Sequence, residues 1–278
     1  MRSLAEFVMK GRRQAIIAVL LIGAIPLIYF ISPVIVSLVI LRKGIQEAAL
    51  VLVWALLPIS AWAMYPNIVS DTPVNLLPVF MLLAVSGLAV ILRSTKSWQI
   101  TMLVTVIVSL SFEFYLRLQP VIMDTLLMQI RPLLEESGAT GEVTRGELIA
   151  LVAAVYASMS VLLLIWSRWL QALLFNPGGF KTEFQSLRIE LKPALPLLLL
   201  ILLAMFGLIV PGTWILYFIM PLLFSGTALV HAIVALKQLS RLWLFVFYAI
   251  FPVIVQFLVL FALIDSWYDF RKKMRTPT

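Results

Sequence analysis

Polar residues recur at every fourth position along one apolar segment of the chain, residues 99–118. They are Thr101, Thr105, Ser109, Glu113 and Arg117. If the segment is a helix, this spacing places all five on one slowly drifting stripe, because positions i and i+4 share a face. Hydroxyl groups, a carboxylate and a guanidinium on one face could hold the polar end of a small ligand.

Glu113 and Arg117 are the charged members of the stripe, and opposite charges four residues apart can pair across one helical turn. Ionisable residues inside membrane segments often mark ligand sites. We therefore expect Thr105, Ser109, Glu113 and Arg117 to bind a ligand. The alternative is structural: the hydroxyls bond back to carbonyls of their own helix, and the charged residues form a pair near the membrane interface.

His231 is the only histidine. It lies six residues before Lys237, on the same predicted helix face as Thr227 and Gln238, where an imidazole could relay protons. The segment 213–236 contains no carboxylate, so a hydrogen bond from His231 to a neighbouring helix is the favoured interpretation. With one histidine and no cysteine, we expect no metal site and no cofactor.

The chain offers few groups for catalysis, because the usual cysteine nucleophile is missing and only one histidine could act as a base. An enzyme would need carboxylates such as Asp71, Glu113 and Asp124 to converge from separate parts of the chain. Gly178 and Gly179 are not followed by the lysine and serine of a phosphate-binding loop, so ATP hydrolysis would require another chain. We predict that the protein is not an enzyme.

The residues above lie on or between apolar segments long enough to cross a membrane. The chain is 63% hydrophobic and 12% charged, which is too apolar for one water-soluble core. We predict an all-α, polytopic transmembrane bundle of eight or nine helices, forming a single integral membrane domain over residues 1–278 with sub-bundles at 1–172 and 194–270. The apolar segments fall at about 15–41, 48–65, 76–92, 99–118, 148–172, 194–210, 213–236 and 242–264.

The helix count depends on the first segment, which is too long for one untilted span. Pro26 and Pro33 interrupt it, and a turn at Ile31-Ser32-Pro33 would divide it into two short helices, giving nine crossings instead of eight. With the N-terminus inside, the divided segment leaves no Lys or Arg in the outside connections 66–75 and 211–212. The basic tail from Arg271 to Arg275 breaks this pattern, so the side of the C-terminus stays open.

The orientation of the chain in the membrane also explains its formal charge of +8, because cytoplasmic connections accumulate Lys and Arg. We therefore expect a multi-pass protein of the bacterial inner (cytoplasmic) membrane, with the lipid bilayer and no nucleic acid as partner. If residues 99–118 enter the membrane near Gln99, Glu113 lies about 21 Å along the helix. That places it in the outer half of a hydrocarbon core about 30 Å thick.

Three connections carry local structure. Residues 3–9 predict a short interfacial helix, and residues 120–135 predict an amphipathic helix followed by a Thr144-x-x-Glu147 capping box. The connection 176–193 begins with a helix stop and continues as a charged amphipathic stretch. It supports an alternative function, a non-transporting scaffold that recruits partner proteins through Asn176, Gly178, Gly179, Lys181 and Arg188.

Several connections together resemble the YybS-like family of bacterial membrane proteins. The matching pieces are LAEFVMKGRRQA, LRKG, NPGGFKTEFQSLRIEL, HAIVALKQLSRLW and LIDSWYDFRKK. That family is similar to the substrate-binding S components of energy-coupling factor transporters, six-helix bundles that work with a coupling protein and ATPase subunits. The resemblance implies that the first six helices end near Gln171, with residues 119–147 covering an outward pocket floored by Glu113.

Two features depart from that pattern. Three further apolar segments follow Gln171, and no vitamin-specific motif is recognisable in the sequence. We expect a membrane protein that binds a small solute or lipid-like ligand from the outer side, as part of a transport assembly with coupling protein and ATPase subunits.

Overall fold

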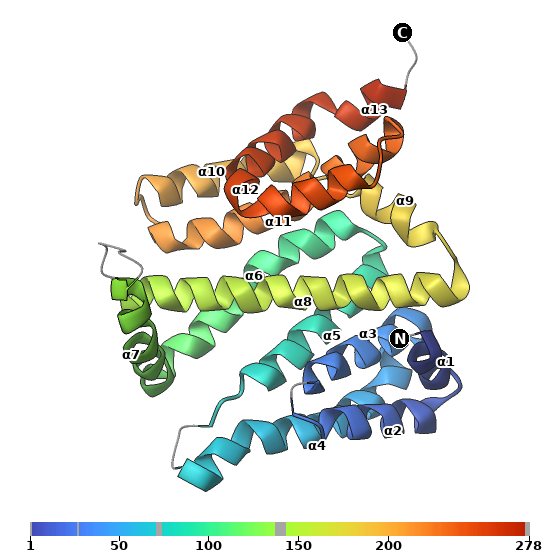
Figure 1. Ribbon diagram of the computed structural model, residues 1–278, viewed down its shortest axis with the longest axis vertical. Helices are drawn as coiled ribbons and strands as arrows, with labels where there is room; N and C mark the ends of the chain where they lie inside the picture. Colours follow the sequence, from blue (N-terminus) through green and yellow to red (C-terminus); the bar gives the residue numbers. More distant parts are fainter. Residues whose placement is uncertain (1, 27, 71–73, 137–142, 276–278) are drawn as a thin grey trace. The chain divides into compact units, whose positions relative to one another are not determined.

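The computed structural model describes residues 2–26, 28–70, 74–136 and 143–275 (Figure 1). Every regular element in these ranges is a helix, which confirms the all-α class. Six helices are long and apolar enough to cross a membrane, as a multi-pass membrane protein requires. They are Ile45–Tyr65, Leu77–Thr95, Trp98–Arg117, Arg145–Phe175, Gly212–Leu236 and Leu242–Tyr268.

The chain folds as two compact units. Unit 1 comprises Met1–Lys96 and Ile107–Pro177, and unit 2 comprises Ser97–Val106 and Gly178–Thr278. The helix α6 (Trp98–Arg117) therefore gives its first half to unit 2 and its second half to unit 1. The predicted sub-bundles, 1–172 and 194–270, did not include this sharing of α6.

Unit 1 is built around α3 (Ser32–Lys43), in which every residue from Ser32 to Leu41 is buried. A helix that is apolar on all sides is typical of a protein core or a membrane span. Here α3 packs against α4, α5 and α8. In Figure 1, α8 is the long helix drawn in yellow-green. The elements of this unit, besides α3 and half of α6, are α1 (Arg2–Met9), α2 (Arg12–Gly23), η1 (Tyr29–Ile31), α4 (Ile45–Ser70), α5 (Leu77–Thr95), α7 (Pro120–Glu136) and α8 (Arg145–Phe175).

The C-terminal end of α3 is closed by side chains from other helices. Arg93 of α5 donates through Nη1 to the carbonyls of Ile40 and Leu41, at 3.2 and 2.7 Å. Gln171 of α8 donates to the Leu41 carbonyl at 3.1 Å. Helix ends leave carbonyls without intrahelical partners, and burying them unpaired is costly. Arg93 and Gln171 supply donors to these carbonyls, so the C-terminal end of α3 can be buried with its carbonyls hydrogen-bonded.

The first apolar segment is divided into two helices. α2 ends at Gly23 and α3 begins at Ser32, with Pro33 in the first turn, where proline is tolerated. Each helix has 12 residues, about 18 Å, which is shorter than a membrane core of about 30 Å. A Cβ added at Gly23 would lie 2.5 Å from Pro58 Cγ, so glycine here permits the close approach of α2 and α4.

Unit 2 is centred on α11 (Ile215–Leu236), which packs against both α10 (Leu191–Met205) and α12 (Leu242–Tyr268). A Cβ at Gly226 of α11 would lie 2.6 Å from the carbonyl oxygen of Leu258 in α12. The absence of a side chain at Gly226 therefore sets how closely these two helices approach. The unit also contains α9 (Gly179–Ser186), η2 (Gly212–Trp214) and α13 (Phe270–Arg275).

The predicted short helices, the capping box and the helix stop are confirmed. Helix α1 covers the predicted interfacial stretch, and α7 covers the predicted amphipathic one. The capping box forms: Thr144 Oγ1 accepts the Glu147 N–H at 3.2 Å, and Glu147 Oε2 accepts the Thr144 N–H at 2.8 Å. Helix α8 ends before Asn176, and Gly178 has φ of +84°, as a helix stop requires.

Candidate functional site

The polar stripe of α6 is buried over most of its length. Thr101, Thr105 and Ser109 have no exposed surface, and Glu113 is 2% exposed. Thr101 Oγ1 donates to the Ser97 carbonyl at 2.9 Å, and Thr105 Oγ1 donates to the Met102 carbonyl at 2.6 Å. These two hydroxyls therefore bond to their own helix, as the structural alternative predicts.

The charged residues of the stripe, Glu113 and Arg117, bond to each other and not to the backbone of α6. Arg117 donates through both Nε and Nη2 to a single oxygen, Oε1 of Glu113, at 2.8 and 2.5 Å. The other carboxylate oxygen, Oε2, is buried and has no hydrogen-bond partner among the described residues. An ionised carboxylate can accept about four hydrogen bonds, and a buried acceptor without a donor costs about 1–3 kcal/mol. Glu113 Oε2 therefore has an open position for a donor.

The second half of α6 is anchored by aromatic contacts within unit 1. Tyr115 Oη accepts the Leu76 N–H at 2.8 Å, which ties α6 to the start of α5. Phe80 of α5 lies 4.6 Å from Tyr115 between ring centroids, and Tyr156 of α8 lies 5.5 Å from Phe112. These contacts fix the part of α6 that carries Glu113 within unit 1. The Glu113 side chain is buried there, where electrostatic interactions are stronger than in water.

The Arg117 side chain is 52% exposed, whereas that of Glu113 is 3% exposed. The guanidinium therefore lies at the boundary between the buried carboxylate and the surroundings. The structure brings together Glu113 and Arg117, while Thr105 lies two turns earlier on the half of α6 that belongs to unit 2.

His231 forms the interaction favoured from the sequence. Its Nε2 lies 2.8 Å from Tyr248 Oη of the neighbouring helix α12. Its ring also meets Phe184 of α9 edge-on, with centroids 5.4 Å apart. Both contacts position the imidazole between helices, which a structural histidine needs, and neither partner is a proton-exchanging carboxylate.

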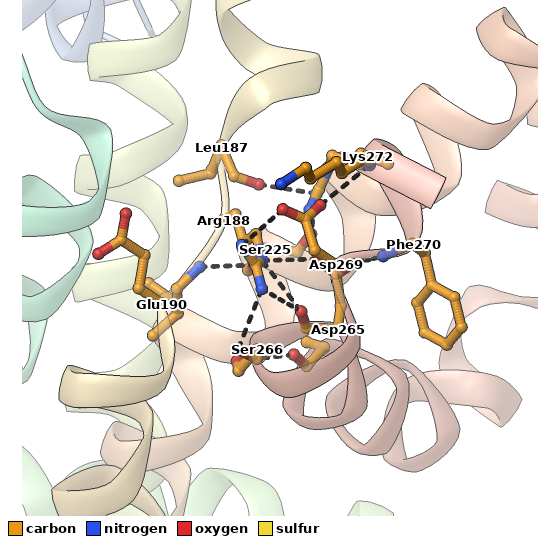
Figure 2. Close-up of polar contacts among 12 residues, drawn as sticks. Leu187, Arg188, Glu190, Ser225, Asp265, Ser266, Asp269, Phe270 and Lys272 are labelled. Carbon is orange, nitrogen blue, oxygen red and sulfur yellow. Dashed lines mark hydrogen bonds and ion pairs between the residues drawn. The ribbon is translucent and has the colours of Figure 1, made fainter. Parts of the chain in front are cut away.

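Sequence reasoning missed a buried ion network in unit 2, where Arg188 and Arg271 meet Asp265 and Asp269. Arg188 donates to the Asp265 carbonyl at 2.7 and 2.9 Å and to Asp269 Oδ2 at 3.0 Å (Figure 2). Arg271 pairs with Asp265 Oδ2 and donates to the carbonyls of Gln185 and Leu187 at 3.0 and 2.8 Å. Asp265 has no exposed surface.

This network fixes the segment after α9 to the end of α12. Burial lowers the pKa of the Arg271 guanidinium, and the Asp265 carboxylate opposes that change. The signal in the sequence was the placement of Asp265 and Arg271 on either side of the end of an apolar segment. Charged residues buried at the end of an apolar helix destabilise the protein unless they form ion pairs or hydrogen bonds.

The predicted docking residues differ in their availability. The Arg188 side chain is 21% exposed and engaged in the network, so it serves the fold of unit 2. Asn176, Gly178 and Lys181 are exposed, and Gly179, the first residue of α9, is half-buried.

The structure brings no metal-binding cluster together in the ranges that it describes. Among those residues, no group of three or more His, Asp or Glu could hold a metal ion. Asp124 lies 3.7 Å from Arg145 as a surface pair. Asp71, the third carboxylate considered for an enzyme, lies outside the described residues.

No protein-family model, curated protein or solved structure matches this chain. The resemblance to the YybS-like family therefore stays a prediction from the sequence.

Proposed function

We propose that this chain is a membrane solute-binding protein in which Glu113 and Arg117 hold the polar end of a small solute or lipid-like ligand. The observation that supports this most directly is the buried, unpartnered Oε2 of Glu113. A buried polar atom without a partner destabilises the protein unless something else supplies the donor. A ligand that brings a donor recovers that loss as binding free energy.

The geometry favours a ligand with a hydrogen-bond donor, such as an ammonium, amide or hydroxyl group, attached to an apolar body. Oε1 is occupied by Arg117, so the ligand donates to Oε2. A cationic donor gives the stronger, charge-assisted bond. Ser109 lies one turn before Glu113 and Thr105 one turn further, so their hydroxyls extend the polar face toward the other end of the helix.

The membrane arrangement belongs to the same proposal. Six helices are long enough to span, and α10 is a shorter apolar helix of 15 residues. Counting α10 as a crossing, the pair α2 and α3 adds one crossing if the two act together and two if they act separately, which gives eight or nine. We place the protein in a bacterial inner membrane with the stripe's Glu113 end outward.

The transport assembly is inferred from the S-component-like resemblance. The sequence contains no phosphate-binding loop, so energy would come from separate ATPase subunits through a coupling protein. The scaffold alternative now depends on Asn176, Gly178 and Lys181, because Arg188 is held within unit 2.

Native mass spectrometry of the tagged protein, gently extracted from its own membrane, tests the proposal. We expect a bound small molecule on the wild type, loss of that molecule in Glu113→Gln, and retention in Glu6→Gln. Glu6 is a matched control, because it also pairs with an arginine four residues away but on an exposed helix. A wild type without a small molecule and without ATPase or coupling subunits would contradict the proposal, and so would equal retention in both variants.

A further inference from the structure

A second site lies in unit 2, where α9, the end of α11 and the start of α12 meet. A pocket of about 440 Å³ opens there, a size typical of small-molecule sites. The polar groups that line it are Lys181 and Gln185 of α9, His231 of α11, and Gln238 and Arg241 of the connection to α12.

The pocket is positively charged. Lys181 and Arg241 are both exposed, and neither forms an ion pair with a described residue. The lining contains no carboxylate. Glu183 is the acidic residue next to Lys181 in α9, but its Oε1 accepts the indole N–H of Trp98 at 2.6 Å. Two cations therefore face the pocket without a neutralising anion.

The end of α11 is arranged so that it does not repel an anion strongly. A helix C-terminus carries partial negative charge on its free carbonyls. Here Gln238 adopts a left-handed conformation with φ of +52°. This turn lets the Gln238 and Leu239 N–H groups bond to the carbonyls of Ala235 and Val234, at 3.2 and 2.9 Å. Two of the last carbonyls of α11 are thus satisfied within the turn.

Apolar surface adjoins the basic groups. Leu239, Leu242 and Trp243 are 41%, 68% and 57% exposed, and tryptophan favours the level of the lipid headgroups. Lys181 and Arg241 come from the two connections that the positive-inside pattern assigns to the cytoplasmic side. Basic pockets between transmembrane helices on that side suit anionic headgroups.

We propose that this pocket binds a phosphate group, presented by an anionic phospholipid of the cytoplasmic leaflet or by a soluble phosphate ester. Lys181 and Arg241 form ion pairs with the phosphate oxygens, and the Gln238 amide donates a hydrogen bond to them. The Gln185 amide nitrogen already donates to the His231 carbonyl at 3.4 Å, and its second N–H is the one that donates to the phosphate. Charge-assisted bonds of this kind are the strong ones in recognition of phosphate. The site is separate from Glu113 and stands whether or not the α6 stripe binds a ligand.

The test compares lipid binding to the full chain, purified in detergent and stripped of native lipid. The pocket variant carries Lys181→Gln and Arg241→Gln together. The matched control carries Arg13→Gln and Lys192→Gln, which removes one exposed Arg and one exposed Lys away from the pocket. Phosphatidylglycerol is titrated against each protein by native mass spectrometry, with zwitterionic phosphatidylcholine as the reference lipid and inorganic phosphate as a competitor at constant ionic strength.

We expect phosphatidylglycerol to bind the wild type and control alike and the pocket variant about 25-fold more weakly, since each basic charge contributes roughly fivefold. If inorganic phosphate does not displace the lipid, the source is the membrane. If inorganic phosphate displaces phosphatidylglycerol from the wild type but not from the pocket variant, the site also accepts soluble phosphate esters. Equal phosphatidylglycerol binding by the pocket and control variants overturns the proposal.

Discussion

The Glu113 carboxylate and the Arg117 guanidinium form an asymmetric pair, in which Oε1 accepts two N–H groups and the buried Oε2 accepts none from the residues that the structure describes. A symmetric bidentate pair would satisfy both oxygens and close the site. The asymmetry leaves one oxygen for another donor. Burial of the carboxylate separates this pair from the Arg2–Glu6 pair with the same spacing, in which Arg2 Nε donates to Oε1 of an exposed Glu6.

Removing Arg117 is therefore expected to harm the fold more than neutralising Glu113. Arg117→Ala leaves a buried carboxylate without its cation, which costs several kcal/mol when both groups are buried. Because Arg117 is half-exposed, solvent screening reduces the expected loss to about 1–2 kcal/mol. Glu113→Gln keeps the shape and removes the charge, so it should unfold at a higher temperature than Arg117→Ala.

The test is thermal unfolding in detergent, measured for both single variants and for Glu113→Gln combined with Arg117→Met. The unfolding temperatures give the order of stability of the three proteins. The combined variant should recover most of the stability that Arg117→Ala loses, because no unpaired charge remains. An Arg117→Ala protein as stable as the wild type would show that the pair does not hold the carboxylate in its buried position.

Local signals in the sequence predicted local structure well. Thr144 and Glu147 specify a capping box within four residues, and Asn176-Pro177-Gly178-Gly179 specifies a helix stop, so neither depends on the rest of the fold. The four-residue spacing of Glu113 and Arg117 likewise specifies their pairing. These features follow from backbone geometry and are readable without a tertiary structure.

Tertiary pairings were not predictable in the same way. Arg188 meets Asp265 across 77 residues of chain, and no periodicity in the sequence connects the two. The unpartnered state of Glu113 Oε2 depends on which side chains pack around α6, so spacing could predict the pair but not its asymmetry. The span count stayed open because α2 and α3 have 12 residues each, and their length alone does not decide whether each crosses the membrane.

The buried network of unit 2 should be far more sensitive than a surface pair. Asp265→Ala strands the Arg271 guanidinium, which is 5% exposed, and a stranded buried charge costs about 3–5 kcal/mol. Asp124→Ala breaks an exposed pair with Arg145 and should cost about 0–1 kcal/mol. Denaturation midpoints of the two variants, measured in the same detergent, distinguish these expectations. Equal midpoints would mean that Asp265 does not hold Arg271 in place.

Alanine substitutions at two helical glycines should change the stability of the protein in opposite directions. Gly226→Ala should destabilise unit 2 by about 1–3 kcal/mol, because the new Cβ would lie 2.6 Å from a backbone oxygen that cannot move aside cheaply. Gly87→Ala in α5 should stabilise by about 0.5–1 kcal/mol, because nothing lies within 4 Å of its Cβ position and alanine favours the helix. Thermal unfolding of both variants checks the sign, and stabilisation by Gly226→Ala would contradict the packing of α11 on α12.

His231 and Tyr248 should matter for stability and not for ligand retention. Tyr248→Phe removes a single hydrogen bond, which is worth about 1 kcal/mol. Native mass spectrometry of Tyr248→Phe and His231→Gln should show the α6 ligand retained at both pH 6 and pH 8. A ligand that is released by either variant at one pH alone would support the proton-relay interpretation instead.

The absence of cysteine makes the orientation of unit 2 directly measurable. Lys181→Cys and Lys237→Cys lie in the α9 and α11–α12 connections, whose residues line one pocket, so both should face the same side. Pro211→Cys precedes η2, at the other end of the span Gly212–Leu236, and should face the opposite side. We expect a membrane-impermeant maleimide to label Pro211→Cys in intact cells, and the two lysine replacements only in inverted vesicles. Labelling of Lys181→Cys and Lys237→Cys from opposite sides would contradict both the pocket and the positive-inside orientation.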